Sequence, residues 1–286
     1  MRFLRDRLVR ILPLYWALSV FMLALLLFVP SVAQTSSFDL MHTIASFLFI
    51  PWTHPVQNLY YPMLVPGWSL NYEIFFYIIF AIGMTISRAR RGPLVVFTCS
   101  VLVAITLLPI IMPLPRPLDF YSRSMVLEFG YGMLLAEAFL RYPSKTSKLW
   151  WLAIVIGSVG IVFSAAVMHF VPHAFAVGLP ALLIVLGTLY VPLRLDGWWE
   201  LIVREIGDAS YSIYLSHFMA MSALGQVWRK LVPDGPYGWA GFVLCSLIGC
   251  TLFGIVVYRF LERPLTGVIR QLVLSMANAD LSASKT

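Results

Sequence analysis

The chain has little charge for its length. Only 12% of its 286 residues are charged, whereas 60% are hydrophobic; a soluble domain has about 25% charged residues. So few charges cannot cover a surface that faces water, but they suit a surface that faces membrane lipid. The formal net charge is +7, yet the basic residues lie in clusters between apolar runs. No basic globular segment is available for nucleic acid, so that class of partner is excluded.

Several signatures of soluble enzymes and secreted proteins are missing. The three cysteines, Cys99, Cys245 and Cys250, lie within apolar stretches and have no ligand-like spacing, which excludes a disulfide framework and a zinc site. There is no glycine-rich nucleotide loop, no nucleophile elbow and no internal repeat. The first apolar run is longer than the core of a signal peptide and lacks a small-residue cleavage site. We therefore interpret it as a retained membrane span.

Long apolar segments are what the chain has instead. A spanning helix needs about 20 mostly apolar residues. Eight segments meet this requirement, at about 12–30, 68–87, 93–112, 123–141, 149–170, 174–191, 207–228 and 238–261. A shorter piece at about 39–50 is typical of an interfacial or re-entrant helix. The sequence thus predicts an all-α fold, a polytopic transmembrane bundle of about eight spans plus one short helix. We expect a single domain over residues 1–270 and a short cytoplasmic tail over residues 271–286.

The positions of lysine and arginine predict the orientation of the bundle. Cytoplasmic loops carry an excess of these residues. If the N-terminus is inside, sixteen of the 20 lysines and arginines lie on the inner side. The outer side then holds Arg116, Arg123, Arg229 and Lys230. We expect a multi-pass protein of the inner (plasma) membrane with both termini in the cytoplasm.

The start of the second span carries the first candidate site. Ser69 and Glu73 are four residues apart, as are Trp68 and Tyr72, so each pair shares a helix face. An apolar run follows Glu73, and a carboxylate there needs a partner or a proton. It could orient a catalytic group or bind a sugar hydroxyl. Alternatively, it is a carboxylate that the dipole favours at a helix start.

The segment 207–217 carries the second candidate site. Asp208 is predicted as an N-cap. Ser210, Tyr214 and His217 follow at i, i+4 and i+7 and form one polar stripe on an apolar helix. Such a stripe can line a water-filled cavity, in which His217 could accept a proton. The alternative is a packed histidine bonded to a neighbouring helix.

Arg7, Arg10 and Glu128 are further candidates. Arg7 and Arg10 share a face at the cytoplasmic mouth, and arginine matches phosphate well; alternatively they only set the topology, with Asp6 pairing with Arg10. Glu128 lies about two turns into its predicted span, beside two glycines and with no local partner. We keep it as a catalytic candidate.

Glu137, by contrast, precedes Arg141 by four residues and is explained as a helix-end pair. The five histidines show no convergence that predicts a metal site.

Four strings of residues, taken together, resemble one family. Residues 10–16 match Arg-x-x-Pro-x-Tyr-Trp, and residues 66–77 contain Trp-Ser-Leu-x-x-Glu-x-x-Phe-Tyr. Residues 207–217 match Gly-Asp-x-Ser-Tyr-Ser-x-Tyr-Leu-x-His, and residues 262–264 match a closing Glu-x-Pro motif. In this order they are similar to acyltransferase family 3, bacterial membrane enzymes that O-acylate exopolysaccharide, lipopolysaccharide and similar surface glycans.

The resemblance implies an acyl-CoA donor, often acetyl-CoA, on the cytoplasmic side. It implies a surface polysaccharide or lipid-linked sugar as acceptor, with no metal. We expect Glu73, His217 and Glu128 to be catalytic, and Arg7 and Arg10 to bind the donor. The acceptor contacts are expected at Trp68, Tyr72, Ser210 and Tyr214. The alternative function is a glycan or lipid transporter, or a non-catalytic membrane subunit, because polar residues on spans also line transport paths.

The resemblance also implies a departure from the family pattern. Members of the family usually have two further spans before the position that matches Arg10. The first of those spans carries an arginine and, some residues later, a histidine thought to be catalytic. We therefore expect that the chain expressed from Met1 has little activity, and that a version encoded from further upstream is active.

Overall fold

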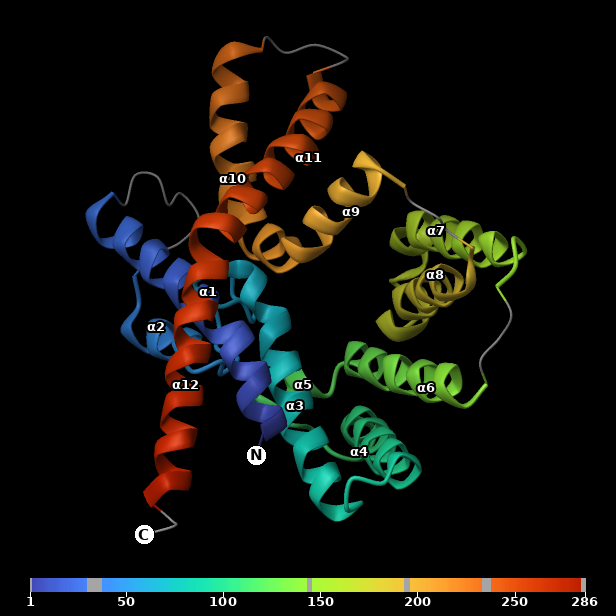
Figure 1. Ribbon diagram of the computed structural model, residues 1–286. Coiled ribbons are helices and arrows are strands. Elements are labelled where there is room, and N and C mark those ends of the chain that lie inside the picture. The colour runs from blue at the N-terminus through green and yellow to red at the C-terminus, as the bar shows by residue number, and fades with distance from the viewer. Residues whose placement is uncertain (1, 30–37, 143–145, 193–195, 233–237, 284–286) are drawn as a thin grey trace. The chain divides into compact units, whose positions relative to one another are not determined.

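The computed structural model describes residues 2–29, 38–142, 146–192, 196–232 and 238–283 (Figure 1). Pro30, the end of the first predicted span, lies outside these residues, as do Lys145, Arg194 and Lys285 among the inner-side cations. Every regular element within the described ranges is a helix, which confirms the all-α fold. The chain divides into two compact units: Met1–Asn71 with Asp196–Thr286, and Tyr72–Leu195.

The first unit is built around two pairs of long helices, and the helices of each pair pack side by side. Its elements are α1 (Arg2–Phe28), α2 (Leu40–Phe47), η2 (Val65–Gly67), the start of α3 (Trp68–Ile86), α9 (Trp198–Asp208), α10 (Ser210–Leu231), α11 (Gly238–Val257), η5 (Tyr258–Glu262) and α12 (Arg263–Ala283). Figure 1 shows α10 beside α11, and α1 beside α12. Gly254 permits the first contact, since a Cβ there would lie 2.5 Å from Cα of Ile213.

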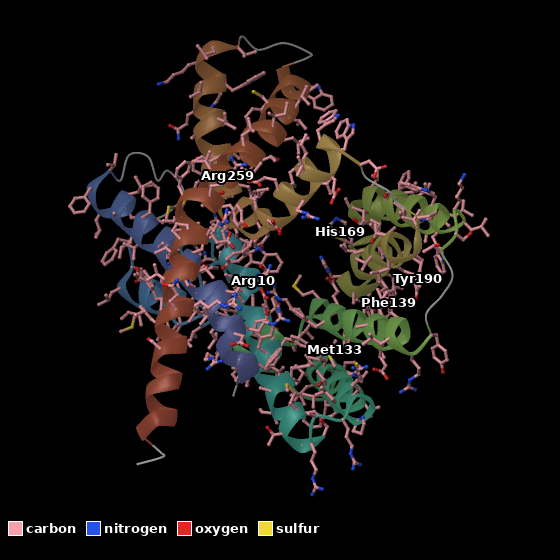
Figure 2. The ribbon with its side chains drawn as sticks, in the orientation of Figure 1. Arg10, Met133, Phe139, His169, Tyr190 and Arg259 are labelled. Atoms are coloured by element: carbon pink, nitrogen blue, oxygen red, sulfur yellow. The ribbon has the colours of Figure 1, made fainter. Side chains whose placement is uncertain are left out.

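The second unit contains the rest of α3 and the helices up to α8. These are α4 (Arg91–Ile111), α5 (Leu118–Tyr121), η3 (Ser124–Val126), α6 (Leu127–Arg141), α7 (Trp150–Val167), η4 (Ala174–Gly178) and α8 (Leu179–Tyr190). Tyr190 stacks on Trp150 with ring centroids 5.0 Å apart, and Phe139 lies 5.5 Å from the same tyrosine ring (Figure 2). Aromatic contacts thus join α6, α7 and α8 near one end.

All eight predicted segments are helical, and the structure supports a membrane protein. Within the described residues, five helical stretches are long and apolar enough to cross a membrane: Phe3–Phe28, Val65–Ile86, Arg91–Ile111, Trp150–Val167 and Gly238–Val273. Helix α6 has 15 residues, Ala174–Tyr190 is a shorter apolar helix, and α10 ends with Arg229 and Lys230 in its last turn. The count of eight spans stays a prediction. The short helix expected near 39–50 is present as α2, capped by Asp39, which accepts a hydrogen bond of 2.6 Å from the His42 N–H.

Helix α9 was missing from the sequence prediction. It occupies a stretch between two predicted spans, and Asp208 is its last residue rather than the N-cap of the next helix. Helix α10 starts after Ala209 without a side-chain cap. Helix α9 forms because this stretch is amphipathic. It carries exposed apolar side chains together with the i,i+4 ion pair Glu200–Arg204, whose charged atoms are 3.0 Å apart. An 11-residue helix is too short to register as a span.

Candidate functional site

Helix α10 connects the family-like strings within the first unit. The Tyr211 hydroxyl donates to the Ile11 carbonyl of α1 at 2.8 Å. The Tyr214 hydroxyl donates to the Pro66 carbonyl at 2.9 Å and lies 2.7 Å from Oγ of Ser69. The Ser69 hydroxyl also donates to the Pro66 carbonyl at 3.3 Å, so either hydroxyl can be the donor in the contact between Ser69 and Tyr214. Strings that are far apart in the sequence are therefore joined by direct hydrogen bonds.

The buried carboxylate of Glu262 completes this cluster. Ser212 Oγ donates to Glu262 Oε2 at 2.6 Å, and both side chains are buried. Arg10 interacts electrostatically with the same carboxylate, and Figure 2 shows Arg10 on α1. Glu262 ends a π-helical turn, a rare geometry found frequently at functional sites. A buried charge requires such partners, since an unpaired one is costly.

The alternative explanation for Arg10, a pair with Asp6, stays a prediction. Asp6 accepts a hydrogen bond from Arg5 Nε at 3.3 Å, and the charge of Arg10 also acts on the carboxylate of Glu262. Both Arg7 and Arg10 are exposed, and Arg7 also lies over the Phe3 ring at 5.6 Å. The guanidinium of Arg10 is thus exposed while its charge still acts on a buried carboxylate.

His217 is held in a defined orientation by its own helix. Its Nδ1 lies 2.5 Å from the Tyr214 carbonyl oxygen. A carbonyl oxygen can only accept, so Nδ1 carries the proton and Nε2 has a lone pair in the neutral ring. The ring is half-buried. This is the tautomer that a proton acceptor needs at Nε2.

The predicted polar stripe on α10 is only partly in this cluster. Tyr214 and His217 lie together, with ring centroids 5.9 Å apart, whereas Ser210 is exposed. The fully buried polar side chains of α10 are instead Ser212 and Ser216. Sequence reasoning missed Ser212 and Glu262 as a pair. The sequence signal for this pair was Glu262 itself, an acidic residue in an apolar helical segment, which needs a polar partner.

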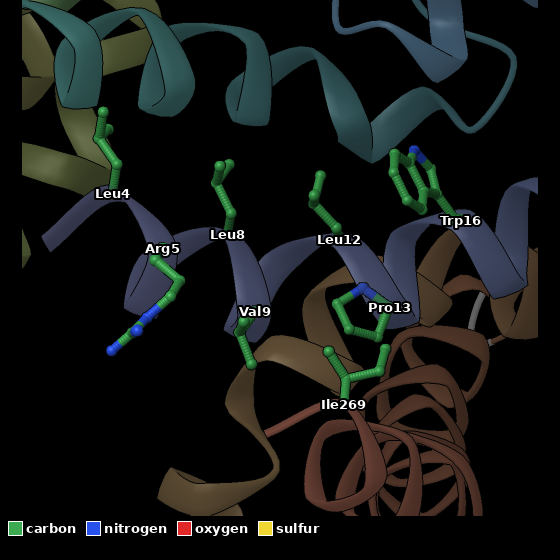
Figure 3. A pocket seen from close by; sticks show the side chains of 8 residues that line it. All are labelled: Leu4, Arg5, Leu8, Val9, Leu12, Pro13, Trp16 and Ile269. Carbon is green, nitrogen blue, oxygen red and sulfur yellow. The ribbon is translucent and has the colours of Figure 1, made fainter. Parts of the chain in front are cut away.

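A pocket of about 640 Å³ lies along α1 (Figure 3). Its lining residues are Leu4, Arg5, Leu8, Val9, Leu12, Pro13, Trp16 and Ile269. With 3.6 residues per turn, the α1 residues in this set fall on the face opposite Arg7 and Arg10. The pocket is apolar apart from Arg5, and it does not bring the two predicted donor-binding arginines to a ligand.

Of the other predicted residues, Tyr72, Glu73 and Glu128 lie in the second unit, whereas Trp68 belongs to the first. The Tyr77 hydroxyl donates to Glu73 Oε1 one turn along α3, so this carboxylate has the partner that its apolar setting demands. The Tyr72 ring is buried and stacks on Phe120 at 4.3 Å, and its hydroxyl donates to the Phe120 carbonyl at 2.5 Å. Acceptor contacts at Tyr72 and at the half-buried Trp68 remain predictions.

Glu128 has a partner that the sequence did not reveal. Its Oε1 lies 2.7 Å from Nδ1 of His173, 45 residues away. Glu128 lies in the first turn of α6 rather than two turns in, because η3 precedes the helix. Glu137, by contrast, pairs with Arg141 at 2.8 Å as predicted. Among the described residues, no group of three histidine, cysteine or acidic side chains could hold a metal ion.

Comparisons with known proteins agree with the family resemblance of the four sequence strings. A family model described as an acyltransferase domain matches residues 1–259. The exopolysaccharide production protein ExoZ of Rhizobium meliloti (strain 1021) is 30% identical over 270 residues, which covers 92% of this chain and 80% of that protein. No solved structure matches the chain. The chain therefore belongs to acyltransferase family 3 and is a membrane acyltransferase that transfers groups other than amino-acyl groups.

Proposed function

We propose that this protein transfers an acetyl group from cytoplasmic acetyl-CoA to a hydroxyl of a cell-surface glycan or its lipid-linked precursor. The observation that carries the proposal is the convergence on α10. Arg10, Ser69 and Glu262 come from three separate strings, and all of them lie around this one helix through direct bonds or charge. The glycan as acceptor is supported by the name of the relative, an exopolysaccharide production protein.

Arg7 and Arg10 suit the phosphate groups of the donor. They share one exposed face of α1, and the planar guanidinium forms paired hydrogen bonds with phosphate. The excess of lysine and arginine on the predicted inner side supports a cytoplasmic location for this end of α1 and for both termini. It also supports a multi-pass protein of the inner membrane.

The transfer itself needs a base and donors to the oxyanion. The base takes the proton of the acceptor hydroxyl while the hydroxyl oxygen attacks the thioester carbonyl. Donors then stabilise the negative charge that develops on the thioester carbonyl oxygen. His217 offers a lone pair on Nε2, because its Nδ1 proton is occupied by the Tyr214 carbonyl. Glu73 is the supporting carboxylate.

The test is the ester content of the surface polysaccharide in a deletion strain. We expect the polysaccharide to be made in a normal amount but to lose its alkali-labile acetyl groups, measured by NMR, and to regain them on complementation. Unchanged acetyl content in the deletion strain would count against the proposal. As a control, complementation with Ser275→Ala, an exposed position on α12, should restore the esters fully.

A transporter or a non-catalytic subunit would behave differently. Loss of a transporter removes the polysaccharide from the surface rather than its esters. Labelled acetyl-CoA should bind to the purified acyltransferase in detergent, and a transporter should show no such binding. The two functions are thus separated by two independent measurements.

A further inference from the structure

The pocket along α1 is a long apolar groove with one cationic residue near its N-terminal end (Figure 3). Two adjacent rows of α1 side chains line it, each with a spacing of four residues, and Ile269 contributes from α12. Between Leu4 and Trp16 the helix rises by about 18 Å. The volume of about 640 Å³ lies within the range of about 300–1,000 Å³ that is usual for ligand sites. The groove is therefore large enough for a long, narrow ligand.

In the predicted topology this groove crosses the boundary between lipid headgroups and hydrocarbon. The first predicted span begins near residue 12, and the basic residues before it lie on the cytoplasmic side. Arg5 is therefore at the level of the headgroups, whereas Leu12, Pro13 and Trp16 are at the level of the acyl chains. A ligand that occupies the whole groove needs a polar end and an apolar end in this order.

The deeper part of the groove suits an acyl chain. Its lining side chains are apolar, and the polar group of Trp16 is already satisfied, because Nε1 donates to the Phe47 carbonyl at 3.1 Å. Lipid tails are as apolar as leucine, so a tail gains packing contacts here but no hydrophobic driving force. Selectivity for one lipid over another must therefore come from the headgroup.

Arg5 supplies the charge that can select a headgroup. Its side chain is 37% exposed, and its Nε donates to Asp6 Oδ1 at 3.3 Å. An exposed pair of this kind is weak, and a guanidinium has five N–H groups. The other N–H groups of Arg5 can bind phosphate oxygens. Because the carboxylate of Asp6 repels an anion, Asp6 and Arg5 should have opposite effects on a negatively charged ligand.

We infer that this groove is a binding site for an anionic phospholipid of the cytoplasmic leaflet. The phosphate binds to Arg5, and one acyl chain lies along Leu8, Leu12 and Trp16. Because α12 also lines the groove, the lipid supports the contact between α1 and α12, which pack side by side. The site is separate from the face of α1 that carries Arg10, and the inference does not depend on the proposed function.

The experiment measures which lipid the purified full chain retains in mild detergent. Phosphatidylglycerol and phosphatidylcholine with the same acyl chains are added in equal amounts, and native mass spectrometry counts the bound molecules. We expect the wild type to prefer phosphatidylglycerol by about fivefold, Arg5→Ala to lose this preference, and Asp6→Asn to increase it. Leu8→Trp, which fills the groove, should also remove the preferred lipid. The matched control is Arg204→Ala, because Arg204 is likewise exposed and paired with an acidic residue of its own helix.

Thermal unfolding separates a bound lipid from a contact with the headgroup alone. A ligand of the folded state raises Tm, so phosphatidylglycerol should raise the Tm of the wild type more than that of Arg5→Ala. Glycerol phosphate, which has no acyl chain, should leave both unchanged. Equal retention of the two lipids by the wild type would overturn the inference, as would a full preference in Arg5→Ala or Leu8→Trp. Equal stabilisation by glycerol phosphate would also overturn it, because the groove would then have no role.

Discussion

The Ser212 hydroxyl donates a hydrogen bond of 2.6 Å to Oε2 of Glu262, 50 residues further along the chain. This bond joins α10 to the π-helical turn between α11 and α12. Both side chains are buried within the first unit, where water cannot replace a lost partner. The bond therefore joins two of the four family-like strings, residues 207–217 and residues 262–264.

Removal of this hydrogen bond should destabilise the first unit. Ser212→Ala takes one donor from a buried carboxylate, and hydrogen bonds to charged groups contribute about 1.5–3 kcal/mol. We expect a lower Tm in a thermal unfolding assay of the detergent-solubilised protein. The control is Ser275→Ala, because Ser275 is exposed and bonds only within its own helix. Equal Tm values for the two variants would contradict the role of Ser212.

A single methyl group should also disturb the contact between α10 and α11. In Gly254→Ala the new Cβ would lie 2.5 Å from Cα of Ile213, so the helices must separate. Overpacking of this kind costs about 1–3 kcal/mol. Gly267→Ala is the matched control, since nothing lies within 4 Å of its Cβ position. There a gain of about 0.4–1 kcal/mol is expected. A thermal unfolding assay that ranks the two variants in the opposite order would rule out the packing argument.

Arg10 should contribute to donor binding through the shape of its side chain as well as its charge. Arg10→Ala should weaken the binding of labelled CoA more than Arg10→Lys, which keeps the charge but loses the planar fork. Equilibrium binding to purified protein measures both. Arg5→Ala serves as a comparison, because Arg5 lines the apolar pocket on the opposite face. Wild-type affinity in both Arg10 variants would remove this residue from the donor site.

The ion pair between Glu205 and Arg259 should attach α9 to η5 in a pH-dependent way. The hydrogen bond of 2.7 Å from Arg259 lowers the pKa of Glu205 below its ordinary value of 4.5. A lowered pKa in the folded state means that the contribution is present above pH 4.5 and is lost as the pH falls through the lowered pKa. The protection of residues 198–208 against hydrogen–deuterium exchange, measured relative to the intrinsic exchange rate at each pH, should therefore fall below pH 4.5.

The same exchange experiment has a built-in control on α9. Glu205→Gln should raise exchange already at neutral pH, whereas Glu200→Gln should not, because Glu200 pairs with Arg204 in its own helix. Exchange of residues 198–208 that is identical in the wild type and in Glu205→Gln at all pH values would show that the pair does not hold α9. The contact is exposed, and added salt should weaken it.

Part of the candidate site was predictable because its signals are local. Arg7 and Arg10 share a face on any helix with their spacing, and Glu137 and Arg141 meet for the same reason. The need of Glu73 for a partner followed from its apolar surroundings, and the Tyr77 hydroxyl supplies it one turn away. Asp208 was wrong as an N-cap because a local capping signal cannot reveal that a preceding amphipathic helix already includes the residue.

The sequence by itself determined the class of the protein. Scarce charge and long apolar runs require helices in lipid, because every backbone polar group there must be satisfied within its own segment, and four short strings indicated the family. Only the tertiary structure decided the partners of Glu262 and Glu128, since Ser212 and His173 lie 50 and 45 residues away. Contacts of this separation depend on how helices pack, and packing is set by side-chain volumes such as the missing Cβ of Gly254 rather than by any periodic pattern.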